Sequence, residues 1–203
     1  MFCYQCEQTA QCTGCTKGGV CGKTPDTADL QDLVIYVTKG VAWFTDRAGA
    51  LGARDAAVDT FILKALFTTV TNVNFDPNRL TDILNEALAV RAKAKALYES
   101  AAAKAGKKPE AAPEGFATWT PPASRDELLL QAAKIGIASR KVQFGEDIAG
   151  LIELVTYGLK GAAAYADHAH VLGHDDPANA ADFAALLALL TRPKLTADDL
   201  LGA

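Results

Sequence analysis

The chain has 203 residues, half of them hydrophobic and 22% charged, so it is long enough to bury the core of one large or two small domains. Its net charge of −4 offers no basic surface for nucleic acid or anionic lipid, and no run of about 18 apolar residues predicts a membrane span. The N-terminus carries cysteines where a signal peptide needs a basic region and an apolar core, so we expect a cytoplasmic protein with neither nucleic acid nor membrane as partner.

The first 21 residues hold all five cysteines of the chain, which are Cys3, Cys6, Cys12, Cys15 and Cys21. An odd number of cysteines in one short segment is a poor disulfide framework, and the glycines between them indicate a loop. Thiolates are soft ligands that suit zinc or an iron–sulfur cluster. We therefore predict a metal-binding loop over residues 1–24.

Two metal assignments are compatible with this loop. Residues 3–6 and 12–15 are Cys-x-x-Cys knuckles of the zinc type, but five residues separate them, against the roughly 15 to 20 typical of such sites. An iron–sulfur cluster has a wider perimeter, and four of the cysteines give the spacing C-x2-C-x8-C-x5-C. These four are Cys3, Cys6, Cys15 and Cys21. The pattern favours iron–sulfur and leaves Cys12 over.

Three helices are predicted behind the loop, in a first bundle over residues 25–105. Thr24-Pro25 is typical of an N-cap followed by proline in the first turn, and the apolar stripe that follows has helical spacing. A second helix is expected over about 56–70, and a third over about 77–105. The short connections between them favour an antiparallel arrangement.

A linker over 106–124 is predicted from its prolines and glycines, and we expect Trp119 to pin it to a bundle. Ser124 and Glu127 fit a capping box that begins a second bundle over 125–203.

The charged residues of the second bundle are expected to lie at its surface. Glu146, Asp147 and Glu153 share a helical face, which is typical of solvated charges. The three histidines, His168, His170 and His174, lie near an expected helix end, where solvated histidines are more common than metal ligands.

An internal repeat relates the two bundles. Residues 30–52 can be laid on 151–173 at an offset of 121 without a gap, and 11 of the 23 pairs are identical. Asp182 to Leu190 would then supply the second helix of copy two, and its third helix has room for about two turns before Ala203. We expect an all-α fold of two related three-helix units with the second truncated, an apolar groove there, and a chain that is the N-terminal part of a longer protein.

The same sequence resembles the hybrid-cluster protein (prismane) family, also called hydroxylamine reductases. The resemblance is carried by MFCYQCEQTA at the start, GC at 14–15, GVCGKT at 19–24, TNVNFD at 71–76, ATWT at 117–120 and LKGAAAYADHAHVLG at 159–173. It covers essentially the whole chain. The cysteine spacing is similar to the compact variant typical of anaerobes.

The resemblance implies a [4Fe–4S] cluster on the four cysteines of the C-x2-C-x8-C-x5-C pattern, and it assigns no ligand role to Cys12. It also implies that electrons pass from an external redox donor to a hybrid iron–sulfur–oxygen cluster, which acts on hydroxylamine or nitric oxide in later domains. No thiol follows Cys21, so we expect this chain to carry no catalytic residue and to be inactive without those C-terminal catalytic domains.

Two other interpretations remain open at this point. One is a zinc-stapled helical module that binds protein partners. The other is a fragment of a carbon monoxide dehydrogenase-like enzyme, a class whose architecture is similar to that of the resembled family.

Overall fold

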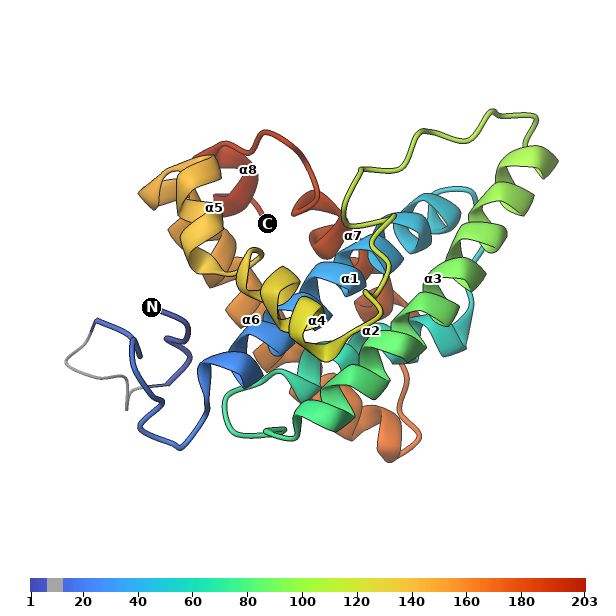
Figure 1. The fold of residues 1–203 in the computed structure, drawn as a ribbon. Coiled ribbons are helices and arrows are strands. Elements are labelled where there is room, and N and C mark those ends of the chain that lie inside the picture. Colours follow the sequence, from blue (N-terminus) through green and yellow to red (C-terminus); the bar gives the residue numbers. More distant parts are fainter. Residues whose placement is uncertain (7–12) are drawn as a thin grey trace.

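The computed structural model describes residues 1–6 and 13–203 (Figure 1). Within them the chain forms eight α-helices and no strand, which confirms the predicted all-α fold. The helices are α1 (Pro25–Gly49), α2 (Ala56–Thr68), α3 (Pro77–Lys104), α4 (Arg125–Ala133), α5 (Ile137–Phe144), α6 (Glu146–Val171), α7 (Pro177–Leu189) and α8 (Ala197–Leu201). None of these helices is both long and apolar enough to cross a membrane.

Side-chain caps fix where most of the helices begin. Thr24 accepts a hydrogen bond from the Thr27 amide at the start of α1, as its sequence predicts. Ser124 accepts from the Glu127 amide at the start of α4. The α7 helix begins before the expected Asp182, because Asp176 caps it and Pro177 occupies its first position.

The internal repeat is visible in the helices themselves. α1 has 25 residues and α6 has 26, while α2 and α7 have 13 each. The connections correspond as well: Gly52 and Gly173 have left-handed backbones, and Asp55 and Asp176 cap the helices that follow. The third helices differ, since α3 has 28 residues and α8 has five.

The two units share one hydrophobic core. α1 packs against α3 of its own unit and against α7 of the other, and α2 packs against α6 (Figure 1). Leu66, Leu84 and Leu187, from α2, α3 and α7, belong to the same buried cluster as the apolar stripe of α1. Each copy of the repeat therefore buries surface of the other copy.

The linker between α3 and α4 packs on this core, as expected from Trp119. The Trp119 indole donates a hydrogen bond of 2.8 Å to the side chain of Gln131 on α4. The backbone carbonyl oxygen of Trp119 accepts a hydrogen bond of 2.6 Å from Arg91 on α3. Phe116 stacks on Tyr36 of α1, with 4.3 Å between the ring centroids.

The α6 helix keeps an apolar face exposed. Leu154 and Tyr165 are 63% and 81% exposed on this face, and Tyr157 lies between them. The positions that correspond to Leu154 and Tyr165 in α1 are Leu33 and Phe44, which are buried. In the first unit the long α3 packs against α1, whereas the second unit has only the short α8 at the corresponding place in the repeat.

Alanine substitution of two corresponding glycines is expected to have opposite effects on stability. A Cβ on Gly40 would lie 2.0 Å from the carbonyl oxygen of Phe116, whereas a Cβ on Gly161 meets nothing within 4 Å. We expect Gly40→Ala to lower the free energy of unfolding by about 2 kcal/mol. Gly161→Ala is expected to raise it by roughly 0.5 to 1 kcal/mol, since alanine favours a helix. Urea unfolding followed by circular dichroism measures both, and equal shifts would contradict the packing of the linker on α1.

Candidate metal centre

Two of the four expected ligands face each other across a short backbone pairing. The Cys15 amide donates a hydrogen bond of 2.7 Å to the Cys3 carbonyl oxygen, and the Phe2 amide donates one of 2.9 Å to the Cys15 carbonyl oxygen. Gly14 makes this approach possible: its backbone is left-handed, and a Cβ there would lie 2.2 Å from the sulfur of Met1. The loop therefore folds back so that Cys15 returns to Cys3.

The other expected ligands lie in different surroundings. Cys15 is buried, Cys3 and Cys6 are half-buried, and Cys21 is exposed in a turn closed by a 2.9 Å hydrogen bond from the Gly19 amide to the Lys23 carbonyl oxygen. Over residues 1–6 and 13–203, no three cysteine, histidine or acidic side chains lie close enough together to hold one metal ion. The structure thus brings Cys3 and Cys15 together, and Cys12 lies outside the described residues.

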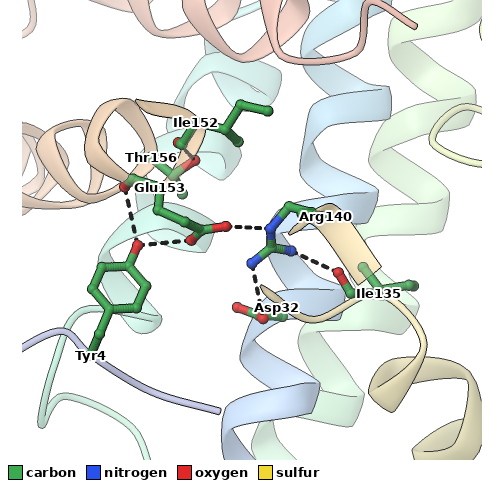
Figure 2. A network of polar contacts seen from close by, with 7 residues as sticks. All are labelled: Tyr4, Asp32, Ile135, Arg140, Ile152, Glu153 and Thr156. Atoms are coloured by element: carbon green, nitrogen blue, oxygen red, sulfur yellow. Dashed lines mark hydrogen bonds and ion pairs between the residues drawn. The ribbon is translucent and has the colours of Figure 1, made fainter. Parts of the chain in front are cut away.

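The two residues between Cys3 and Cys6 both attach the loop to the helical body. The Tyr4 hydroxyl donates a hydrogen bond of 2.8 Å to the Glu153 carboxylate on α6 (Figure 2). Gln5 is buried, and its side-chain oxygen accepts a hydrogen bond of 3.1 Å from the Thr71 amide between α2 and α3. The first Cys-x-x-Cys segment is therefore held at two separate places.

Tyr4 is hydrogen-bonded to a polar network that is centred on Arg140 of α5. The Arg140 guanidinium donates to Glu153 through Nε, to Asp32 of α1 at 3.3 Å and to the Ile135 carbonyl oxygen at 2.7 Å (Figure 2). Burial lowers the pKa of Arg140, but the carboxylates of Asp32 and Glu153 outweigh burial and raise it. Burial, and then the charge of Glu153, raise the pKa of Tyr4 well above its ordinary value, so this phenol stays a neutral donor.

The expectation that Glu153 is a surface charge is wrong. Its side chain is 13% exposed and lies between Tyr4 and Arg140. Glu146, by contrast, is 76% exposed and pairs with Lys141. One signal in the sequence could have found the difference, because the internal repeat aligns Glu153 with Asp32, and these are the two carboxylates that Arg140 holds.

A second buried attachment follows Cys21. Lys23 is 2% exposed, and its ammonium donates a hydrogen bond of 2.8 Å to Gln31 of α1. The Gln31 side chain donates in turn to the Asn74 carbonyl oxygen at 2.7 Å, and the Lys23 ammonium lies 5.4 Å from the centre of the Phe75 ring. Both ends of the cysteine loop are therefore attached to the helical body by polar contacts, half-buried at Tyr4 and Gln5 and buried at Lys23.

The chemistry of this loop fits an iron–sulfur group. It offers four thiols from one short segment, two of which a backbone pairing already brings together. The buried ammonium of Lys23, two residues after Cys21, can offset part of the negative charge that four thiolates carry.

Two of the three histidines contact neighbouring side chains. His170 Nδ1 lies 2.7 Å from a carboxylate oxygen of Asp175, and His168 meets the ring of Phe67 edge-on at 5.4 Å between centroids.

Comparison with known proteins places the chain in a family. The model of the Prismane/CO dehydrogenase family matches residues 1–200. Proteins named hydroxylamine reductase from Rhodospirillum rubrum and Geobacter sulfurreducens are each 44% identical to the chain, and one from Desulfitobacterium hafniense is 45% identical. Each of these matches covers 100% of the chain and 35% to 37% of the relative.

The chain therefore belongs to the Prismane/CO dehydrogenase family. It spans a little over a third of the length of the curated relatives it matches. The resemblance that the cysteine loop and the later segments indicate is thus confirmed.

Removal of Arg140 is expected to loosen the cysteine loop as well as the helices. Arg140→Met leaves the half-buried carboxylates of Asp32 and Glu153 without their cation, and we expect a loss of about 3 kcal/mol in the free energy of unfolding. Hydrogen exchange of the amides of residues 2–6 should also become faster, because Glu153 then no longer holds Tyr4 in place.

Arg192→Met is the matched control for this variant. Arg192 is 58% exposed in its ion pair with Asp199, so its loss should cost less than about 1 kcal/mol. Equal effects of the two substitutions on stability, or unchanged exchange at residues 2–6 in Arg140→Met, would contradict the role given to the network.

Proposed function

We propose that the chain is the N-terminal electron-transfer part of a hydroxylamine reductase-like, hybrid-cluster oxidoreductase. A [4Fe–4S] cluster is held in this proposal by Cys3, Cys6, Cys15 and Cys21. The observation that carries the proposal is the 44% identity to proteins named hydroxylamine reductase over the full length of the chain. The anchored loop with its four thiols supports it.

The residues of the chain would have distinct tasks in this role. The four cysteines supply thiolate ligands, and the polar contacts of Tyr4, Gln5 and Lys23 fix the path of the loop between and after them. When bound, a [4Fe–4S] cluster accepts and releases a single electron at a potential set by nearby hydrogen bonds and by exposure to solvent. Cys21 is exposed, which places one expected ligand at the surface, where an external redox donor could approach.

The proposed partners are an external redox donor and the C-terminal catalytic domains of the parent enzyme. Those domains would carry the hybrid cluster and reduce hydroxylamine or nitric oxide, and the parent enzyme would act in the cytoplasm. The exposed apolar face of α6 at Leu154, Tyr157 and Tyr165 is the surface of this chain that suits such a domain contact. A groove between α6 and α7, lined by Tyr165, Phe183 and Leu186 among others, continues this face.

Anaerobic reconstitution with iron and sulfide tests the cofactor. We expect about four iron and four sulfide per chain, and a paramagnetic signal of one unpaired electron after reduction. Cys15→Ser should lose the cluster, because Cys15 is an expected ligand and is paired with Cys3.

Cys12→Ser is the control, because the resemblance gives Cys12 no ligand role; this variant should keep its iron and sulfide. Equal iron and sulfide in both variants would contradict the ligand set. A colourless protein that binds zinc and no iron would favour the zinc-stapled module instead.

A further inference from the structure

A cavity of about 220 Å³ adjoins the Arg140 network. Its wall is formed by α1, α5 and α6 together with Phe116 of the linker, Lys134 and Ile135 between α4 and α5, and Leu190 after α7. Apolar side chains make up part of this wall, and Tyr36, Ser139 and Gln143 contribute polar groups. Asp32, Arg140 and Glu153 also border the cavity, and Figure 2 shows each of the two carboxylates bonded to Arg140.

Two lysines of this wall, Lys39 and Lys134, form no ion pair within the described residues; Lys134 is exposed, whereas Lys39 is buried. Lys39 is 6% exposed, and its ammonium forms no hydrogen bond or ion pair with any residue in 1–6 or 13–203. The nearest aromatic ring is that of Phe116, whose centre lies 6.0 Å from Nζ. The carboxylates of Asp32 and Glu153 influence Lys39 electrostatically, but both are bound to Arg140.

This ammonium is still mostly charged at neutral pH. Burial, with a smaller contribution from Arg140, lowers the pKa of Lys39 to about 8. Below that pH the ammonium is charged and no anion is bonded to it, so an anion that enters the cavity can pair with it.

Lys160 provides an internal comparison, because it is the counterpart of Lys39 in the repeat. It is 3% exposed, and burial lowers its pKa to about 8 as well. Lys160 does not line the cavity. The two lysines therefore share burial and charge but differ in access to this space.

We propose that the cavity binds a small organic carboxylate, which pairs with the ammonium of Lys39 and lays its apolar body against Phe116, Ile135 and Ile152. Ser139 and Gln143 offer further hydrogen-bond donors to such a carboxylate. A ligand of a few carbon atoms matches a cavity of about 220 Å³.

The charge of the wall favours a monoanion. Asp32 and Glu153 border the same cavity, so a doubly charged anion such as phosphate meets repulsion that a single carboxylate meets less strongly. The apolar part of the wall gives no compensation to a bare inorganic ion, whereas it stabilises the hydrocarbon part of an organic acid. The ligand would lie beside Glu153, which also holds Tyr4 of the cysteine loop.

The experiment titrates the full chain with butyrate and follows backbone amide shifts by NMR. Butyramide has nearly the same shape without the charge, and inorganic phosphate has charge without an apolar body. We expect saturable butyrate shifts at residues 36–39 and 139–143, with affinity for butyramide and phosphate at least about tenfold weaker. Lys39→Met should weaken butyrate binding about tenfold or more, and Lys160→Met should leave it within about twofold.

The affinity for butyrate should also fall as the pH rises above about 8, where Lys39 loses its proton. The other titratable or charged groups that face Lys39 are Tyr36, Lys134, Asp32, Glu153, Arg140 and Lys160. Lys160→Met removes a lysine that titrates over the same range, so a fall that persists in this variant points to Lys39.

Several results would overturn the proposal. They are the absence of saturable butyrate binding, equal binding of butyramide or phosphate, unchanged binding in a folded Lys39→Met, or equal loss in Lys39→Met and Lys160→Met. If Lys39→Met does not fold, Ser139→Val tests the same wall from α5, and unchanged butyrate affinity in that variant would also count against the site. The titration requires no iron or sulfide, so its outcome is independent of the proposed electron-transfer role.

Discussion

Arg140 holds two carboxylates that come from equivalent positions of a repeated helix, Asp32 on α1 and Glu153 on α6. The guanidinium has several donors in a fixed plane, so one side chain on the short α5 can bind both carboxylates and a backbone carbonyl oxygen at once. The two long helices are thereby joined through charge as well as through the shared apolar core. Glu153 in turn accepts a hydrogen bond from the Tyr4 hydroxyl, and this contact links the segment from Cys3 to Cys6 to the same network.

Identical residues at corresponding positions of the repeat lie in different environments in the two copies. Gly40 lies under the carbonyl group of Phe116, whereas Gly161 faces open space. Likewise, Leu33 is buried in the core, while its counterpart Leu154 is largely exposed. The residue type is the same at each pair, and the difference arises from what packs against the helix: the long α3 and the linker in one unit, and the five-residue α8 in the other.

The cysteine loop is a short segment with extensive support from the helices. Its attachments reach α6 through Tyr4, the turn between α2 and α3 through Gln5, and α1 through Lys23 and Gln31. These contacts draw on both units of the repeat, so the helical body provides a common frame for the loop. Such support would suit the proposed cluster, because small shifts in hydrogen bonding and solvent exposure change the potential of an iron–sulfur group.

The sequence by itself determined the all-α class, the N-caps at Thr24 and Ser124, and the repeat, because these depend on local residue type and spacing. It also predicted a metal-binding loop, because thiol ligands can be recognised from residue type and spacing alone; this remains a prediction. Only the tertiary structure decided that Glu153 lies half-buried between Tyr4 and Arg140 and that Lys39 borders a cavity. These properties arise from contacts with Tyr4, α5 and the linker, and the residue pattern of one helix does not show which of its faces a neighbouring segment will cover.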